Sequence, residues 1–340
     1  MKSLFAFSVL AFTALMALGA SAGSGKAVVS LDPSLDTFIA SNAKLEMLRE
    51  REFGISEGPL WVRDGKSGYL LFSDITANVI YKWTPDRQLS VFMKDAGFVG
   101  DLNKVALEGY FARSGPIFVY DFGPNGLTLD PQGRLIICAQ GDRAIVRIEK
   151  DGKRTVLADR FEGKRLSRPN DVIVKSDGTI YFTDPRPNTP SMELPETMVF
   201  MLKDGQVRQI AKGYRANGIA LSPDEKILYV NGEKVIHAYD VRPDGSVGEG
   251  RVFADMNSDK APGGTDGMKV DKAGNIYCTG PGGVWIVSAA GKHIGTILLP
   301  EPATNLAFGD ADYKTLYITD RRHLMSIRLK TAGIAPGPSN

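Results

Sequence analysis

The sequence has few of the cysteines and histidines that build zinc sites and disulfide frameworks, and it has no marked excess of basic residues. It has 2 Cys and 3 His in 340 residues, whereas tetrahedral zinc sites are built from thiolate and imidazole ligands. Lys and Arg number 41 against 39 Asp and Glu, a formal net charge of +2. This balance excludes the basic excess that is typical of a nucleic-acid-binding protein. With 43% hydrophobic residues, the composition also excludes a disordered chain.

Long apolar runs are absent as well, except for one at the beginning. A basic start at Lys2 precedes an apolar run from Leu4 to Leu18, and Ala20-Ser21-Ala22 then gives an A-x-A cleavage pattern. This three-part pattern predicts a secretory signal peptide over residues 1–22. The run is too short for a comfortable membrane span, although an uncleaved anchor helix is the alternative. We therefore expect an exported, periplasmic protein with no membrane partner after cleavage.

The two cysteines, Cys138 and Cys278, both lie in apolar β-type runs. An oxidising compartment permits a disulfide between them. Two buried free thiols are the better interpretation, because small buried cysteines are common in protein cores. The repeat described next also places the two residues in units that are not adjacent.

Glycine is plentiful, at 37 residues. Many of these glycines belong to a sequence repeat that recurs along the chain. Each copy is a short apolar strand, a tight turn containing Asp, Pro or Gly, and a second apolar strand, as in Gly126–Ile137 and Asp171–Phe182. Third and fourth strands follow, as at Ala144–Glu149 and Arg154–Ala158. Four antiparallel strands repeated at this period predict a β-propeller.

The copies can be counted from the residue just before each first strand. These residues are Glu57, Asn125, Asn170, Asn217, Asp266 and Thr304. The steps between them are 68, 45, 47, 49 and 38 residues. A blade takes about 40–50 residues, so the first step holds one blade and an insertion, which we place within Gly97–Phe122. We predict one all-β domain over residues 23–340, a six-bladed β-propeller whose last blade is closed by a strand from Thr37–Arg49.

The first strand of each propeller blade lines the central channel, so the six residues just named should share one mouth of it. Each of them carries a side-chain oxygen. Hard cations such as Ca²⁺ take six to eight oxygen ligands, and Glu57 and Asp266 supply two negative charges to balance a divalent ion. The alternative is that these residues only cap turns, as Asn and Asp often do, which leaves Glu57 unexplained. We expect a divalent metal site at this mouth.

Five short motifs also occur in a fixed order along the chain. They are Glu57-Gly58-Pro59-Leu60-Trp61, Phe72-Ser73-Asp74-Ile75, Arg168-Pro169-Asn170-Asp171-Val172, Asn217–Asp224 and Asp266-Gly267-Met268. Together they resemble the senescence marker protein / gluconolactonase / luciferin-regenerating-enzyme-like family, and the run Ala158–Pro185 is most similar to its bacterial gluconolactonase branch. The resemblance spans Glu57–Leu329. It implies a six-bladed propeller with a divalent metal, commonly Ca²⁺, in the channel.

Members of that family hydrolyse sugar lactones. The resemblance implies four metal ligands, which are Glu57, Asn170, Asn217 and Asp266. It also implies that Asp266 is the catalytic base or nucleophile, and that Arg168, Asn125 and Asn170 contact the substrate. We therefore expect hydrolysis of a gluconolactone-like sugar lactone to the aldonic acid, by attack of metal-polarised water on the carbonyl carbon.

Several alternatives stay open at this point. The ion expected is Ca²⁺, with Zn²⁺, Mg²⁺ or Mn²⁺ as alternatives. The same site suits another ester hydrolase, such as an organophosphatase, and a non-catalytic ligand-binding propeller would use the metal structurally. The chain departs from the bacterial lactonase pattern at Arg186–Pro190 and in the Gly97–Phe122 insertion, which leaves the particular lactone open. We expect a small-molecule substrate, no nucleic-acid partner, and a monomer or small homo-oligomer.

Overall fold

The computed structural model describes residues 26–101, 111–114, 117–120, 122–185 and 192–338. The expected signal peptide and the Arg186–Pro190 loop lie outside these residues. The described part of the chain is almost entirely strand and turn, with a short 3₁₀ helix, η1 (Pro33–Thr37). Within this part no helix is both long and apolar enough to cross a membrane.

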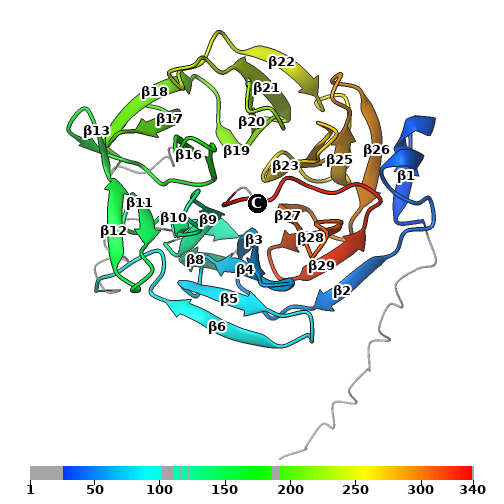
Figure 1. The fold of residues 1–340 in the computed structure, drawn as a ribbon, viewed down its shortest axis with the longest axis horizontal. Coiled ribbons are helices and arrows are strands. Elements are labelled where there is room, and N and C mark those ends of the chain that lie inside the picture. Colours follow the sequence, from blue (N-terminus) through cyan, green and yellow to red (C-terminus); the bar gives the residue numbers. More distant parts are fainter. Residues whose placement is uncertain (1–25, 102–110, 115–116, 121, 186–191, 339–340) are drawn as a thin grey trace, which may run out of the picture.

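Six antiparallel sheets are arranged radially around one axis (Figure 1), which confirms the predicted six-bladed propeller. We number the blades in chain order. Blade 1 contains β3 (Ser56–Asp64), β4 (Ser67–Asp74), β5 (Val79–Trp83) and β6 (Leu89–Lys94). Blade 2 contains β9 (Pro124–Leu129), β10 (Leu135–Ala139), β11 (Ala144–Ile148) and β12 (Arg154–Ala158). Blade 3 contains β15 (Val172–Val174), β16 (Ile180–Asp184), β17 (Met198–Lys203) and β18 (Gln206–Lys212).

The other three blades repeat this order, with the first strand innermost. Blade 4 contains β19 (Ala216–Leu221), β20 (Ile227–Gly232), β21 (Val235–Asp240) and β22 (Arg251–Asp255). Blade 5 contains β23 (Met268–Val270), β24 (Ile276–Gly280), β25 (Gly283–Val287) and β26 (His293–Leu298). Blade 6 contains β27 (Ala303–Gly309), β28 (Thr315–Asp320) and β29 (Leu324–Arg328).

The ring is closed by a strand from the beginning of the described chain. Strand β2 (Leu45–Arg49) pairs antiparallel with β29 and becomes the outer strand of blade 6. This confirms the closing strand expected within Thr37–Arg49. A second early strand, β1 (Val28–Ser30), pairs with β26 and adds a fifth strand to blade 5. It was not predicted, because three residues are too few to show the alternation of a strand.

Two small hairpins lie outside the six blades. The insertion between blades 1 and 2 contains β7 (Phe111–Ser114) and β8 (Ile117–Tyr120), paired with each other. The predicted insertion is therefore present, but it forms strands that its weak alternation did not indicate. The second hairpin, β13 (Arg160–Phe161) and β14 (Lys164–Arg165), connects blades 2 and 3.

Apolar side chains fill the spaces between neighbouring blades. Trp61 in blade 1, for example, stacks on Tyr317 in blade 6 with ring centroids 5.7 Å apart. Cys138 lies in blade 2 and Cys278 in blade 5, and both are buried free thiols. This confirms the interpretation of the cysteines as core residues rather than a disulfide.

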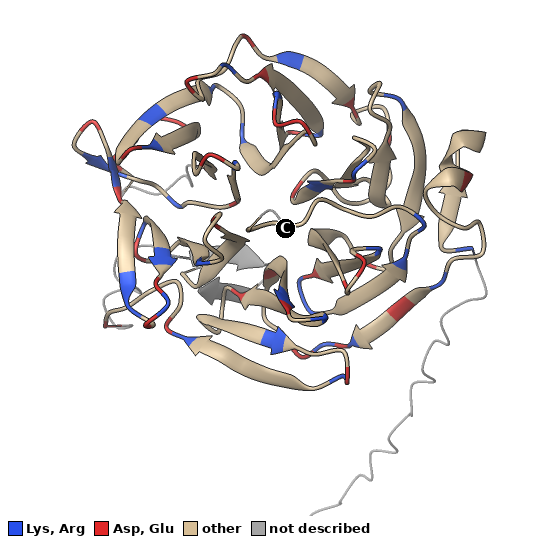
Figure 2. Ribbon diagram, viewed as in Figure 1, with Lys and Arg blue, Asp and Glu red and all other residues tan. Residues whose placement is uncertain are grey.

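Basic and acidic residues are interspersed around the ring (Figure 2). Many of them pair locally. Lys175, for example, places its Nζ atom 3.2 Å from an oxygen of Asp177 and 3.5 Å from an oxygen of Glu225. The charge of Lys175 is therefore compensated by the neighbouring carboxylates of Asp177 and Glu225.

The innermost strands meet so closely at one end of the channel that a side chain cannot fit at several positions. A Cβ atom on Gly267 would lie 2.0 Å from Asn305 Oδ1, and one on Gly58 would lie 2.1 Å from the carbonyl oxygen of Asn125. Gly58 also has a φ of +48°, which side chains disfavour. Glycine is therefore required where the strands of adjacent blades converge.

We expect Gly267→Ala to destabilise the protein, because the new methyl group must displace Asn305 and the backbone behind it. Overpacking of this kind costs roughly 1–3 kcal/mol, which should lower the melting temperature by a few degrees. Gly264→Ala is the matched control, since a Cβ atom there meets no described atom within 4 Å. Equal melting temperatures for the two variants, measured by circular dichroism, would contradict the close approach.

Candidate active site

Each innermost strand contacts the innermost strands of its two neighbours, and each begins beside one of the six aligned residues. These are Glu57 in β3, Asn125 in β9, Asn170 before β15, Asn217 in β19, Asp266 before β23 and Thr304 in β27. All six innermost strands begin at the same end of the channel. The six residues therefore lie together at one mouth of it.

Hydrogen bonds between blades hold the backbone at this mouth. Three second-strand side chains donate to the carbonyl oxygen of the mouth residue in the next blade. These bonds are Ser73 Oγ to Asn125 O (2.7 Å), Thr183 Oγ1 to Asn217 O (2.6 Å) and Asn231 Nδ2 to Asp266 O (2.7 Å). The Gly126 N–H donates to the carbonyl oxygen of Asn170 at 2.7 Å. The mouth residues are thus positioned by the scaffold itself.

Thr304 differs from the other five mouth residues. Its Oγ1 donates to the carbonyl oxygen of Ser56 at 2.6 Å and lies 3.0 Å from Thr319 Oγ1. The bond to Ser56 connects blade 6 to blade 1, and the contact with Thr319 lies within blade 6. The Thr304 hydroxyl therefore serves the closure of the ring, and the aligned oxygen at this position is a structural one.

Glu57 is buried, with 4% of its surface exposed. Its Oε2 accepts hydrogen bonds from the Gly58 N–H at 3.0 Å and from Asn305 Nδ2 at 3.1 Å. Burial raises the pKa of Glu57 to about 7, and the nearby charge of Asp171 acts in the same direction. A carboxylate held in this way is poorly compensated and would gain from a cation.

Asp266 lies close to Glu57 in the same mouth. Burial raises the pKa of the Asp266 carboxyl well above its ordinary value, and the charges of Glu57 and Asp171 raise it further. A hydrogen bond from the Asn217 side chain acts in the opposite direction. The structure therefore brings Glu57, Asn217 and Asp266 together.

Two amide oxygens at the mouth are buried without a partner. Asn125 Oδ1 and Asn217 Oδ1 accept no hydrogen bond from any described residue. Leaving a buried acceptor unsatisfied costs about 1–3 kcal/mol, and such groups usually indicate a missing ligand, ion or water. Asn217 Oδ1 is also attached to the side chain that contacts Asp266.

These donors fit a hard divalent cation. Two carboxylates and neutral amide oxygens match the oxygen ligands of Ca²⁺. In the described part of the chain, no group of three or more His, Cys, Asp and Glu side chains is arranged to hold a metal, so a cation at this mouth must use the amide oxygens too. Asn170 lies at the same mouth, and its N–H donates to the carbonyl oxygen of Thr183 at 2.8 Å.

Sequence reasoning missed a second layer of polar residues just below the mouth. In four blades the residue after the mouth residue is glycine, but in blades 3 and 6 it is Asp171 and Asn305. Asn305 donates to Glu57, as described above, and Lys269 Nζ lies 3.9 Å from Asp171 Oδ2. The two exceptions to the glycine pattern were visible in the sequence and could have indicated this layer.

Two arginines come from the loops around the mouth. The N–H groups of Ser167 and Arg168 donate to the buried carboxylate of Asp184 at 2.7 and 2.5 Å, which fixes the loop that carries Arg168. Arg321, which the sequence analysis did not select, accepts a hydrogen bond at its carbonyl from the Ser56 N–H at 3.0 Å. Its positive charge lowers the pKa of Asp266, so Arg321 lies near the mouth.

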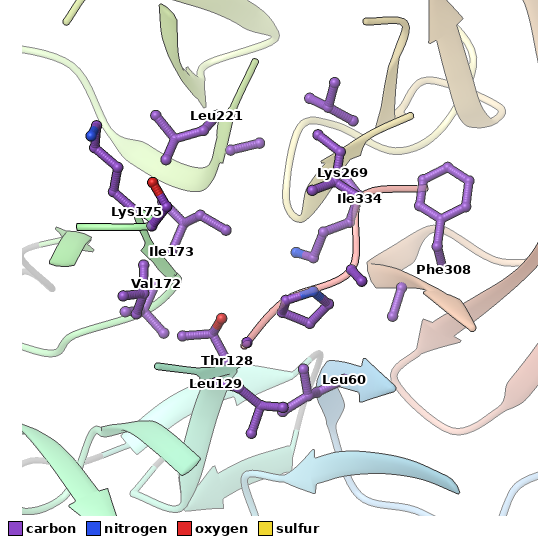
Figure 3. Close-up of a pocket in the computed structure, with 18 of the residues that line it drawn as sticks. Leu60, Thr128, Leu129, Val172, Ile173, Lys175, Leu221, Lys269, Phe308 and Ile334 are labelled. Atoms are coloured by element: carbon purple, nitrogen blue, oxygen red, sulfur yellow. The ribbon is translucent and has the colours of Figure 1, made fainter. Parts of the chain in front are cut away.

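The other end of the channel holds a cavity of about 420 Å³ that apolar and polar side chains line together. Figure 3 shows Leu60, Val172 and Leu221 around it, with Ile334 of the C-terminal segment crossing it. The side chains of Lys175 and Lys269 also line this cavity. The mouth and this cavity are therefore opposite ends of one channel, with Lys269 and Asp171 between them.

Comparison with known proteins agrees with this architecture. Residues 55–322 match the SMP-30/gluconolactonase/LRE-like region. The chain belongs to this family. Among its relatives is the gluconolactonase of Zymomonas mobilis subsp. mobilis, 32% identical over 325 residues, which cover 90% of this chain and 87% of that protein. Pentonolactonase XacC of Haloferax volcanii is 26% identical over 277 residues, covering 78% and 81% respectively.

A solved structure of the SMP-30/gluconolactonase/LRE-like family has the same fold. The gluconolactonase XC5397 of Xanthomonas campestris is 30% identical to this chain, with a TM-score of 0.74. The match covers 90% of this chain and 96% of that one. The blades and the mouth described above are thus the architecture of a family that contains lactonases.

We expect Glu57→Gln to make the metal-free protein less sensitive to pH. Because the folded pKa of about 7 exceeds the ordinary value of 4.5, neutral Glu57 contributes stability below about pH 4.5 that is lost as the pH rises to about 7. The advantage of the Gln variant in unfolding free energy should therefore grow between these values, by up to roughly 3 kcal/mol. Urea unfolding of chelator-treated protein measures it.

The control for this experiment is Glu149→Gln. The hydrogen bond from Arg147 lowers the pKa of Glu149, so its ionised form contributes stability above its ordinary pKa, and the Gln variant should lose stability there. If the unfolding free energy of Glu57→Gln changes with pH in the same way as that of the wild type, the pKa of Glu57 is not raised by burial.

Proposed function

We propose that the protein is a hydrolase that opens a sugar lactone of the gluconolactone type to the aldonic acid. The observation that carries the proposal is the pairing of Glu57 and Asp266 with unsatisfied amide oxygens at a preformed mouth. Two relatives, at 32% and 26% identity, are named as a gluconolactonase and a pentonolactonase. They support the same reaction class for this chain.

We propose one divalent cation at this mouth, held by Glu57, Asn170, Asn217 and Asp266. Ca²⁺ suits their oxygen donors best, with Mg²⁺, Mn²⁺ and Zn²⁺ as alternatives. When bound, such an ion acts as a Lewis acid that polarises a carbonyl oxygen. The unpartnered Asn217 Oδ1 supports its assignment as a ligand.

The chain's own residues account for the remaining chemistry. Asp266 is the general base: its carboxylate takes a proton from the water that attacks the lactone carbonyl carbon. Its raised pKa makes it a stronger base than an ordinary aspartate. The ring C–O bond then breaks, and the released alkoxide oxygen takes up a proton. Asn217 orients Asp266 through their hydrogen bond.

Substrate orientation falls to polar residues at the mouth. Arg168 donates hydrogen bonds to the sugar hydroxyls, and Asn125 and Asn170 donate or accept them. Arg168 is half-buried on a loop fixed by Asp184, and Asn125 offers an unpaired Oδ1. A guanidinium held in this way binds hydroxyl and carboxylate groups without first losing much conformational freedom.

The test of the catalytic assignment is Asp266→Asn. General-base removal should lower kcat for gluconolactone by roughly 10²- to 10⁴-fold, with the melting temperature preserved. Asp240→Asn, which loses only an exposed ion pair with Arg251, is the control and should keep wild-type activity. Near-normal hydrolysis by Asp266→Asn would remove Asp266 from this role.

The test of the cation is its removal. Chelator-treated protein should lose lactone hydrolysis and regain it with one of Ca²⁺, Mg²⁺, Mn²⁺ or Zn²⁺, while calorimetry should show weaker binding of that ion to Asn217→Leu. Full activity after chelation would contradict the proposed metal site. Rates on an organophosphate ester, measured in parallel, decide between a lactonase and another esterase, and binding without any hydrolysis would indicate a ligand-binding propeller.

A further inference from the structure

The second layer of the channel contains an ion pair that the proposed reaction does not use. Lys269 Nζ lies 3.9 Å from Asp171 Oδ2 and donates to the carbonyl oxygen of Met268 at 3.1 Å. Asp171 is buried, with 2% of its side chain exposed. Its oxygens also accept hydrogen bonds from the N–H groups of Val172 at 3.0 Å and Ile219 at 3.4 Å. Asp171 is thus held in place directly beneath the mouth by one ion pair and two backbone hydrogen bonds.

The position of Lys269 is unusual for a lysine. It points into the channel between the mouth and a cavity whose walls include Leu60, Val172 and Leu221 (Figure 3). A lysine largely enclosed by protein, as Lys269 is with 24% of its side chain exposed, is costly unless it compensates a charge. The charge that it compensates is that of Asp171, whose field reaches both Glu57 and Asp266.

Four charged groups lie at or directly beneath the proposed ligands, while Arg168 and Arg321 belong to the loops around the mouth. With a cation bound, Glu57, Asp266 and Asp171 would contribute three negative charges and Lys269 one positive charge, which leaves two negative charges to face the cation. Arg321 is exposed to solvent, which screens its contribution. Two negative charges match a divalent ion, whereas three would favour a trivalent ion.

We propose that Lys269, by neutralising Asp171, sets the charge of the mouth and makes the site selective for divalent over trivalent cations. This inference rests on the proposed metal site. Lys269 and Asp171 do not touch the cation; they are positioning residues that act through the field at the ligands. In the low-dielectric interior a unit charge a few ångströms below the site changes ion affinity strongly, and it does so in proportion to the charge of the ion.

The experiment compares Ca²⁺ with Tb³⁺, two ions of similar size and different charge. Calorimetry gives the Kd for Ca²⁺, and Tb³⁺ luminescence gives the Kd for Tb³⁺, both on the full chain after chelation. Lys269→Met should increase the preference for Tb³⁺ by at least roughly tenfold, because the extra negative charge attracts the trivalent ion more. Methionine suits the apolar cavity wall, so the fold should be kept.

Two further variants make the test independent of that one substitution. Asp171→Asn should shift the preference toward Ca²⁺ by a similar factor. The double variant Asp171→Asn/Lys269→Met removes both charges together, leaves no unpaired buried ion, and should return to the wild-type ratio. Lys175→Met is the matched control: Lys175 lines the same cavity, but its charge is compensated by Asp177 and Glu225, and its loss should leave the ratio unchanged.

The outcomes separate this inference from the proposed function. A wild-type protein that binds neither ion would overturn the metal site and this inference together. A wild-type protein that binds Ca²⁺, with an unchanged ion preference in Lys269→Met and Asp171→Asn, would overturn this inference alone. A merely structural ion pair would alter the melting temperature of the two single variants without moving the preference.

Discussion

The structure depends on how closely six innermost strands approach one another at one mouth of the channel. Hydrogen bonds from each blade to the carbonyl oxygens of the next, such as Thr183 Oγ1 to Asn217 O, fix the strands at this distance. The approach leaves no room for a side chain at Gly58 or Gly267. With the backbone fixed by these bonds, the side chains of Glu57, Asn217 and Asp266 are held together in a small volume.

The close approach of the mouth side chains explains the raised pKa values of the two carboxyl groups. Water would normally solvate Glu57 and Asp266 separately, but convergence of the strands buries them side by side and raises both pKa values. The same packing leaves Asn125 Oδ1 and Asn217 Oδ1 without donors among the described residues. Crowded carboxyl groups and unpaired acceptors favour a partner with positive charge or hydrogen-bond donors. This is the physical basis of the proposed cation site.

Much of the architecture could be predicted from the sequence, because the repeat and its turn residues are local signals. The count of blades, the closing strand β2 and the buried thiols followed from them. The role of a residue could not be predicted from the sequence when its partner lies in another blade. Thr304 has the right oxygen at the right position, yet it bonds to Ser56. Asp171 and Lys269 are about a hundred residues apart in sequence, and only the closed ring brings them to 3.9 Å.

The C-terminal segment gives the ring a contact that its blades alone do not provide. The N–H of Ile334 bonds to Val270 in blade 5 at 3.3 Å, and a Cβ atom on Gly337 would lie 3.1 Å from the Leu129 side chain in blade 2. Figure 1 shows these blades on opposite sides of the axis. The segment therefore connects two opposite blades across the far end of the channel, in addition to the contacts between neighbouring blades. A change in the distance between these two blades would break its contacts with Val270 or Leu129, so the segment opposes flattening of the ring.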